Sequence, residues 1–269
     1  MSETEGDSFE RLTAFVEDEL DFATSHYNDS YLKRRFASRM RRRGTQSYSE
    51  YLAVLEDDPD EHVALLDALA INVTGFFRNP DVWEGVRDIL RELTDENRRV
   101  SAWSAGCADG REPYSLAMLA RDDPRTEADT VDIRATDIND SALRSAREGV
   151  YETTRTIDID EQLRFLSNYH RYVDRDGDEF RIRESLKDNV TFEHHDLIRD
   201  PPKSDVDLVI CRNLFIYIDG DYKRPVLENV KRSLRPGGYL VIGKAETIPT
   251  ELRHEFAVLD AELRIYRRE

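Results

Sequence analysis

Residues 100–119 read VSAWSAGCADGREPYSLAML, and this stretch decides the fold. Val100–Ala105 is a short apolar run typical of a buried strand, and the residues after Arg111 have the apolar spacing of a helix. Between them lies a loop that begins at Gly106 and ends at Gly110. A strand, a glycine loop and a helix in this order are typical of the ligand-binding edge of an open α/β sheet.

The alternation of strands and helices continues towards the C-terminus. Further strands are predicted at 130–136, 189–193, 206–210 and 239–242, with helical patterns between them. Such alternation predicts a Rossmann-like, mostly parallel sheet with helices on both faces. Two last apolar runs, 256–259 and 263–266, predict a terminal antiparallel hairpin.

One segment interrupts this alternation. Asp174-Arg175-Asp176-Gly177-Asp178 lies between two runs with the pattern of strands, 169–173 and 179–183. An Asp-Gly pair between such runs is a strong signal for a tight hairpin. We therefore expect a small β insertion at about 168–187.

The N-terminal part has helical periodicity instead. Apolar residues recur at helical spacing from Phe9 to Leu55, and Asp58-Pro59 and Asn79-Pro80 each have the form of an N-cap followed by a first helical residue. The sequence thus predicts an all-helical N-terminal domain at 1–78 and an α/β domain at 79–269.

The composition is strongly acidic. The 269 residues include 56 acidic and 39 basic side chains, a formal net charge of −17, and only 6 of the basic residues are lysines. Many aspartates and few lysines suit a salty cytoplasm, where high ionic strength screens self-repulsion. This favours a halophilic source, such as an archaeon, over an ordinary acidic mesophilic protein. The charge also argues against binding to nucleic acid or to anionic membranes.

Several other classes of protein are excluded. The N-terminus, MSETEGDSFE, has no signal-peptide pattern, and no run reaches the roughly 18 apolar residues of a membrane span. Cys107 and Cys211 are too few for a disulfide framework. His194 and His195 are adjacent on a predicted strand, so they point to opposite faces and we expect no metal site. We expect a cytoplasmic monomer.

The glycine loop indicates the kind of ligand. It lacks the pattern of a dinucleotide fingerprint and the Gly-Lys-Ser/Thr of a phosphate-binding loop. It carries Asp109 and Glu112 instead, which would repel a pyrophosphate, so a cationic or neutral nucleoside such as S-adenosylmethionine fits better. Asp137 ends the next strand, where a carboxylate is placed either to accept ribose hydroxyls or to cap a helix.

Five motifs, taken in order, resemble those of the chemotaxis receptor methyltransferases, the CheR family. The first is the stretch from Ala102 to Met118 that surrounds the glycine loop. The others are Asn72-Val73-Thr74-Gly75-Phe76-Phe77-Arg78, Ala135-Thr136-Asp137-Ile138, Cys211-Arg212-Asn213-Leu214-Phe215-Ile216-Tyr217, and Leu234–Leu240 with Gly243 and Glu246.

The resemblance spans nearly the whole chain. It implies a class I methyltransferase-like fold and transfer of a methyl group from S-adenosylmethionine to glutamate side chains of chemoreceptors, which leaves S-adenosylhomocysteine and glutamate methyl esters. Arg78 and Tyr217 match the residues that approach the transferred methyl group. The cofactor contacts fall on Asn72, Thr74, Arg78, Gly106, Glu112, Asp137, Asp196, Leu197, Arg212 and Asn213.

The glycine loop departs from the family pattern. The family usually has Ser-Thr-Gly-Glu-Glu, and this chain has Ala108-Asp109-Gly110-Arg111-Glu112, which lacks the hydroxyls but keeps the second acid. Two other interpretations therefore stay open: a related methyltransferase with another substrate, and a non-catalytic, cofactor-sensing receptor adaptor.

A basic segment contrasts with the acidic chain. Residues 31–43 contain no acid, and a helix is predicted at about 30–43. A solvated helix face is the simplest interpretation, and the absence of interleaved aromatic residues weakens a nucleic-acid patch. The family resemblance implies contact with the acidic methylation region of a receptor's cytoplasmic domain. The expected contact residues are Lys33, Arg34, Arg35, Arg39, Arg42 and Arg43.

Overall fold

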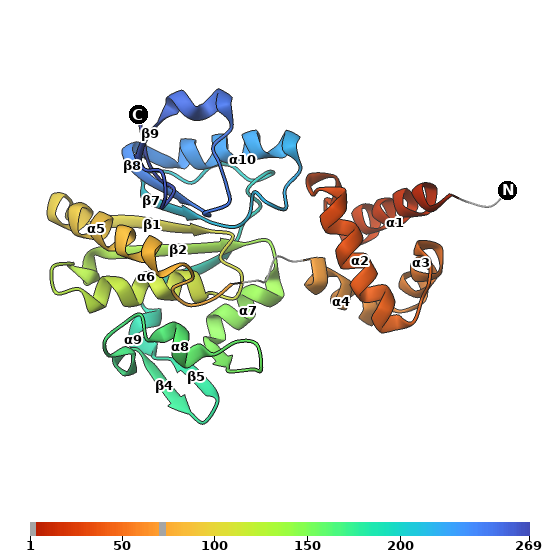
Figure 1. The fold of residues 1–269 in the computed structure, drawn as a ribbon, viewed down its shortest axis with the longest axis horizontal. Coiled ribbons are helices and arrows are strands. Elements are labelled where there is room, and N and C mark those ends of the chain that lie inside the picture. Colours follow the sequence, from red (N-terminus) through yellow and green to blue (C-terminus); the bar gives the residue numbers. More distant parts are fainter. Residues whose placement is uncertain (1–3, 70–73) are drawn as a thin grey trace. The chain divides into compact units, whose positions relative to one another are not determined.

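The computed structural model describes residues 4–69 and 74–269 (Figure 1). It divides into two units. One contains the described part of Met1–Ile71 together with Phe215–Lys223, and the other contains the described part of Asn72–Leu214 together with Arg224–Glu269. The first unit is therefore discontinuous in sequence, because a short segment from the second half of the chain packs with the N-terminal helices.

The first unit is a small helical domain. Its helices are α1 (Glu5–Leu20), α2 (Asp29–Arg43), α3 (Tyr48–Asp57) and α4 (Pro59–Leu69), with a 3₁₀ turn η1 (Thr24–His26) after α1. The side chains of Thr4, Asn28 and Ser47 accept hydrogen bonds from the first turns of α1, α2 and α3. The apolar positions that predicted α1, α2 and α3 lie in or against their shared core, so the periodic pattern identified the buried face of these helices, whereas Val63 of α4 is 59% exposed.

The second unit contains a seven-stranded sheet in the order β6-β2-β1-β7-β8-β10-β9. Five strands are parallel, and β10 and β9 are antiparallel to their neighbours. The strands are β1 (Val100–Ala105), β2 (Val131–Asp137), β6 (Val190–His194), β7 (Val206–Cys211), β8 (Leu234–Ile242), β9 (Phe256–Asp260) and β10 (Ile265–Arg268). This confirms the predicted parallel sheet and its terminal hairpin.

Four helices accompany this sheet. They are α5 (Pro80–Glu96), α6 (Arg111–Asp122), α7 (Asp140–Glu148) and α10 (Gly220–Ser233). Pro59 and Pro80 are the first residues of α4 and α5, as predicted, because the fixed φ of proline suits a first helical turn whose N–H would lack a partner. The buried faces of α5 and α6 join β1, β2 and β7 in one large core.

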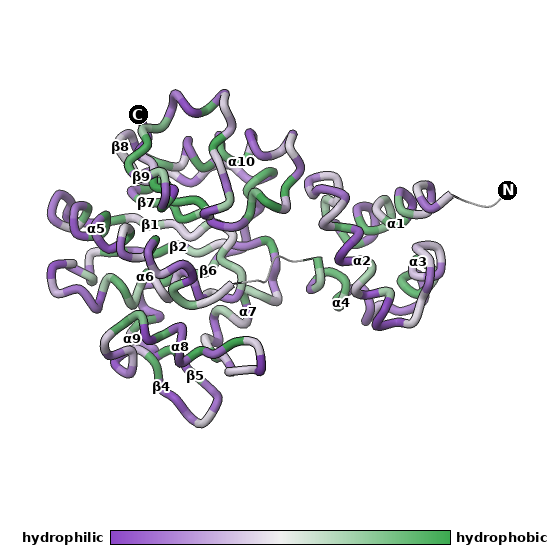
Figure 2. The backbone as a smooth tube through the Cα atoms, viewed as in Figure 1, coloured by the Kyte–Doolittle hydropathy of each residue, from purple (hydrophilic) through white to green (hydrophobic). Residues whose placement is uncertain are grey.

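The remaining elements are short. They are the 3₁₀ turns η2 (Ala128–Thr130), η3 (Tyr169–Arg171) and η4 (Thr250–Glu255), and the helices α8 (Ile159–Leu163) and α9 (Glu184–Lys187). In Figure 2 hydrophilic and hydrophobic residues alternate along the helices. No helix in the described ranges has both the length and the apolarity that a bilayer span requires.

The predicted hairpin is present, with Gly177 in the left-handed region at φ 60°. Strands β4 (Val173–Asp176) and β5 (Glu179–Ile182) are antiparallel, and β3 (Val150–Glu152) adds a third strand on the other side of β5. The third strand was not predicted, because a three-residue segment carries too little pattern to identify a strand. Strand β8 also begins at Leu234, before Pro236-Gly237-Gly238 rather than after it.

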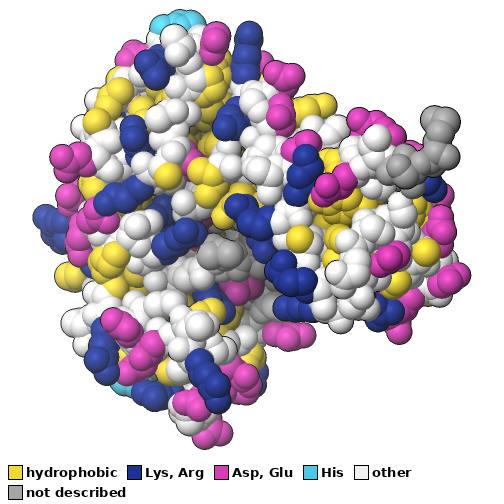
Figure 3. Space-filling view, turned by 45° about the vertical axis from the view of Figure 1, so that its right-hand side comes forward, with side chains coloured by type: hydrophobic (Ala, Val, Ile, Leu, Met, Phe, Trp, Pro, Cys, Tyr) yellow, Lys and Arg dark blue, Asp and Glu magenta, His cyan; other side chains and the backbone are white. Residues whose placement is uncertain are grey.

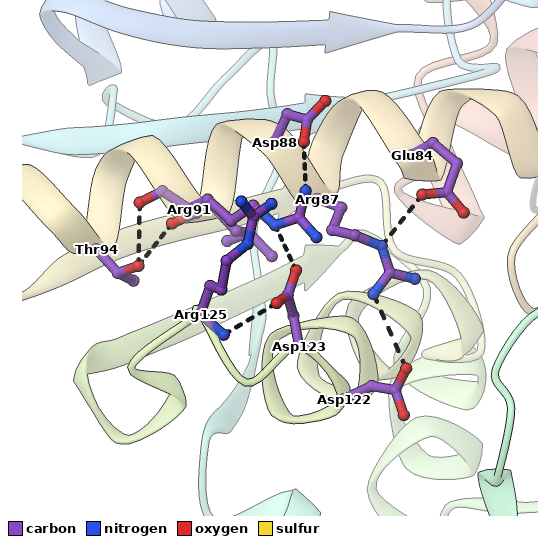
Figure 4. Close-up of polar contacts among 9 residues, drawn as sticks. Glu84, Arg87, Asp88, Arg91, Thr94, Asp122, Asp123 and Arg125 are labelled. Carbon is purple, nitrogen blue, oxygen red and sulfur yellow. Dashed lines mark hydrogen bonds and ion pairs between the residues drawn. The ribbon is translucent and has the colours of Figure 1, made fainter.

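An ion-pair network joins α5 to the end of α6 (Figure 4). The Arg91 Nε donates to Oδ2 of Asp123 at 2.5 Å, and the Asp123 side chain is only 2% exposed. The other oxygen of Asp123 accepts from the backbone N–H of Arg125. Arg87 makes a looser contact in the same network, at 3.8 Å from Asp122. The buried Arg91–Asp123 contact is therefore the one expected to affect stability most.

We expect Arg91→Met to lower the free energy of unfolding by about 2–3 kcal/mol, because it leaves the buried Asp123 carboxylate without its guanidinium partner. The matched variant Arg87→Met removes a longer contact, 3.8 Å from Asp122, and a pair with the exposed Glu84, so its cost should be smaller. Urea unfolding of both variants measures the difference. Equal losses would contradict the assignment.

Candidate functional site at the carboxyl edge of the sheet

The glycine loop lies at the carboxyl ends of β1 and β2. These strands are parallel and in register, with Ala105 opposite Thr136. The backbone N–H groups of Gly106 and Cys107 both donate to the carbonyl oxygen of Thr136, at 2.8 and 2.9 Å. The loop therefore folds across the end of β2 and brings its backbone to the edge where open α/β sheets bind ligands.

Gly110 at the end of this loop is required by packing. Its φ is +89°, and a Cβ at this position would lie 2.8 Å from the Cβ of Ala146. The N-terminus of α6 approaches α7 too closely for any side chain, and L-residues rarely adopt this backbone conformation. The family's glycine is thus kept where geometry demands it, although the neighbouring residues differ.

Asp137 closes the loop from the end of β2. Its Oδ2 accepts from the backbone N–H of Ala108 at 2.8 Å, and its Oδ1 accepts from Asn139 at 3.0 Å. Burial raises the pKa of Asp137, against these hydrogen bonds, which lower it. Helix α7 is capped by the side chain of Asn139. The alternative of Asp137 as a helix cap is therefore wrong.

Glu112 is the second carboxylate of the site, in the first turn of α6, and its side chain is 12% exposed. Its Oε1 accepts from the hydroxyl of Ser104 at 2.9 Å, and its Oε2 lies 3.6 Å from Nη1 of Arg212. Burial raises the pKa of Glu112 to about 7, although the positive charges of Arg212 and Arg78 oppose this change. Both predicted acids of this edge are thus partly buried carboxylates.

Arg212 connects this acid to the segment before α5. It follows β7 and is 7% exposed. Its Nη2 donates to the carbonyl oxygen of Arg78 at 2.8 Å and to Oδ1 of Asn79 at 2.9 Å. The Arg78 backbone is thereby fixed beside the Glu112–Arg212 pair.

Asn213 depends on a residue that the sequence interpretation did not assign to the site. Its φ is +61°, and its backbone N–H donates to Oε2 of Glu246 at 2.9 Å. The same oxygen accepts from Gly243 at 2.6 Å, and Glu246 is 3% exposed. Glu246 was recognised only as part of a motif. The signal that could have identified it is an acid four residues after the apolar run at 239–242.

The remaining predicted cofactor residues have local partners. The carbonyl oxygen of Thr74 accepts from Nη1 of Arg111 at 3.3 Å, and Asn72 lies outside the described residues. Asp196 follows β6, where its Oδ1 accepts from the backbone N–H groups of the next turn, and Leu197 is buried. Since β6 is parallel to β2, these two residues lie at the same edge as Asp137.

Tyr217 belongs to the helical unit. Its ring centroid is 5.0 Å from that of Tyr31 on α2, and its carbonyl oxygen accepts from the backbone N–H of Asn28 at 3.1 Å. Although it lies only four positions after Asn213, Tyr217 packs with a different part of the structure from the predicted cofactor residues.

The predicted receptor-contact residues all lie on α2, but their surroundings differ. Arg39 is bound bidentately by Glu61 at 2.8 and 2.6 Å, and its side chain is 11% exposed. The buried Tyr51 hydroxyl donates to the same carboxylate. Burial raises the pKa of Glu61, but the hydrogen bonds from Arg39 and Tyr51 outweigh it and lower the pKa overall. Arg39 therefore stabilises the helical unit through its hydrogen bonds to Glu61.

The other basic residues of α2 are closer to the surface. Lys33 pairs with Asp29 and Arg43 with Asp58, while the half-buried Arg35 lies over the ring of Tyr31. Arg34, Arg41 and Arg42 are exposed and make no ion pair with any residue that the structure describes. Figure 3 shows acidic, basic and hydrophobic side chains intermixed over the visible surface.

Two family models match this chain. Residues 72–265 match "CheR methyltransferase, SAM binding domain", and residues 7–70 match "CheR methyltransferase, all-alpha domain". A chemotaxis protein methyltransferase of Listeria monocytogenes is 31% identical over 93% of each chain.

Two further curated relatives have the same description. A chemotaxis protein methyltransferase of Borreliella burgdorferi is 31% identical over 90% of this chain and 88% of its own. Chemotaxis protein methyltransferase 1 of Pseudomonas aeruginosa is 29% identical over 89% of this chain and 90% of its own. With matches to both domains and to relatives along nearly their whole length, this chain belongs to the CheR family of S-adenosylmethionine-dependent methyltransferases.

Proposed function

We propose that this chain transfers a methyl group from S-adenosylmethionine to glutamate side chains in the cytoplasmic domains of chemoreceptors and so forms glutamate methyl esters. The observation that carries the proposal is the pair of partly buried carboxylates, Glu112 and Asp137, beside the glycine loop of a CheR-family sheet. We further propose that the helical domain binds the receptor through α2.

The polar groups of the edge suit this cofactor. Glu112 and Asp137 supply acceptors, which suit an ammonium group and ribose hydroxyls respectively. The Nδ2 of Asn139 and the Nε of Arg212 are buried and have no hydrogen-bond partner among the described residues. The edge thus offers both acceptors and unused donors. We assign the remaining contacts to Asn72, Thr74, Arg78, Gly106, Asp196, Leu197 and Asn213.

The reaction requires little acid–base catalysis by the protein. When bound, the cofactor supplies an electrophilic methyl group on a sulfonium. A glutamate carboxylate is already ionised near neutral pH, so no general base is required. The protein must position the carboxylate in line with the methyl group and exclude water. We assign the first task to Arg78, through a charge-assisted hydrogen bond, and we place Tyr217 beside the methyl group.

Labelled methyl transfer to purified receptor cytoplasmic fragments tests this function. We expect base-labile label on the receptor, because an ester is cleaved by base and an N-methyl amine is not. Cofactor binding without transfer would favour the adaptor, and transfer only to RNA or to a small molecule would favour a different methyltransferase.

We expect Arg78→Ala to lose most transfer, and full activity in this variant would remove Arg78 from the site.

We also propose that the chain functions at high ionic strength. Its net charge is −17, and salt screens the resulting self-repulsion. The transfer assay is therefore run in both dilute and multimolar KCl, with higher activity expected in the concentrated salt. Higher activity in dilute buffer would contradict this proposal.

Binding of the cofactor should depend on pH near neutrality. The carboxyl group of Glu112, with a pKa of about 7, must be ionised to pair with the cofactor's ammonium group. Affinity should therefore fall as pH decreases below about 7, by up to tenfold per pH unit. Calorimetric titration measures this dependence. The dependence should be absent in Glu112→Gln, and an unchanged pH profile in that variant would assign the titration to another group.

The exposed part of α2 should determine receptor affinity. We expect Arg34→Glu/Arg42→Glu to raise the KM for the receptor fragment about tenfold and to leave cofactor affinity unchanged, because repulsion replaces attraction towards an acidic surface. The matched control is Arg98→Glu/Arg155→Glu, which makes the same change in net charge at exposed positions of the other unit. A similar KM in both double variants would mean that only net charge matters.

A further inference from the structure

The segment Phe215–Lys223 carries Tyr217 away from Asn213 and into the helical unit. It meets the chain immediately before α2. We propose that Asn28, the N-cap of α2, is a positioning residue for Tyr217, so that the helix assigned to receptor recognition also fixes the tyrosine assigned to the methyl group. This inference rests on the proposed function for the role of Tyr217, but the contacts that support it are independent of that role.

Asn28 binds the Tyr217 segment through both its backbone and its side chain. Its backbone N–H and its Nδ2 donate to the carbonyl oxygen of Tyr217 at 3.1 and 2.9 Å, and Nδ2 also reaches the carbonyl oxygen of Ile216 at 3.3 Å. An antiparallel bridge between Tyr27 and Ile218 continues the contact. The backbone N–H of Asp219 then donates to the carbonyl oxygen of His26 at 2.9 Å. Four consecutive residues of the segment are thus bound to the chain at 26–28.

The two ends of the Asn28 amide have separate tasks. Its Oδ1 accepts from the backbone N–H of Tyr31 at 2.9 Å and from the hydroxyl of Ser30 at 2.8 Å, which caps α2. Its Nδ2 donates to the carbonyl oxygens of Ile216 and Tyr217. Asp and Ser are also good N-caps, but an ionised Asp has no donor, and a Ser hydroxyl is too short to cap the helix and reach the segment together. A mutation of Asn28 can therefore remove the hydrogen bonds to the Tyr217 segment and leave the N-cap of α2 in place.

The ring of Tyr217 is fixed by the same turn of α2. It packs on Tyr31, which is fully buried and whose hydroxyl donates to the carbonyl oxygen of Leu69 at 2.7 Å. The guanidinium groups of Arg34 and Arg35 lie 5.9 and 5.0 Å from the centre of the Tyr31 ring. One turn of helix therefore carries an exposed arginine of the proposed receptor face and supports the Tyr217 side chain.

The test compares Asn28→Asp with Asn28→Ser. Both variants keep a cap on α2, and both lose the donor to the carbonyl oxygens of Ile216 and Tyr217. We expect kcat for receptor methylation to fall about tenfold in each, because a displacement of the positioning group misaligns the reactants. The affinity for S-adenosylmethionine and the melting temperature should stay near those of the wild type. A kcat within twofold of wild type in both variants would overturn the proposal.

A double-mutant cycle separates positioning from a general loss of structure. In a Tyr217→Ala background, Asn28→Asp should cause no further loss of kcat, because its effect passes through Tyr217. An additive loss would overturn the proposal.

Hydrogen exchange of the peptide that contains residues 215–223 gives a readout that needs no activity. We expect faster exchange in both Asn28 variants, and unchanged exchange would show that Asn28 does not hold the segment. A wild-type protein that does not methylate receptors would overturn the proposed function, while the exchange data would still decide whether Asn28 anchors this segment.

Discussion

The candidate site depends on carboxylates that accept backbone N–H groups at the carboxyl edge of the sheet. Where parallel strands end, the chain leaves the hydrogen-bond ladder and its N–H groups need new acceptors. Asp137 supplies them for Ala108 and Asn139, and Glu246 supplies them for Asn213 and Gly243. Removing a carboxylate from water is costly, and these hydrogen bonds offset part of that cost. The loops that define the cofactor edge are thus fixed before any ligand arrives, which reduces the entropy lost on binding.

Features determined by neighbouring residues were predictable from the sequence. Pro59 and Pro80 mark helix starts because proline fixes its own φ, and Asp176-Gly177 marks a hairpin because glycine tolerates a positive φ. Features that depend on partners far away along the chain were not predictable from the sequence. No local pattern shows that Arg39 is neutralised by Glu61, that Glu246 supports Asn213, or that Asn28 meets Tyr217 across almost 190 residues. The individual residues of the candidate site were predicted from family motifs, whereas their contacts with one another required the three-dimensional structure.

The basic helix is less positive at its surface than its sequence suggests. Among its basic side chains, Arg39 forms a largely buried ion pair with Glu61. Lys33 and Arg43 pair with nearby acidic residues. A cation that pairs within its own domain contributes little to long-range attraction. In strong salt, where the screening length falls to about 3 Å at 1 M, the exposed arginines act only on a surface already in contact. The receptor recognition that we propose for α2 would therefore depend on the shape of the two surfaces as well as on their charge.

The discontinuous helical unit also affects how such proteins can be recombined. The order of the domains along the chain suggests that the N-terminal helices form an exchangeable module ending near residue 71. However, Phe215–Lys223 packs with those helices and is encoded inside the catalytic half. A chimera made by exchanging the N-terminal region alone would pair helices from one parent with this segment from the other, so the packing of the Tyr217 ring on Tyr31 would join side chains from two parents. Grafts that keep the packing within the helical unit should therefore transfer both stretches of sequence.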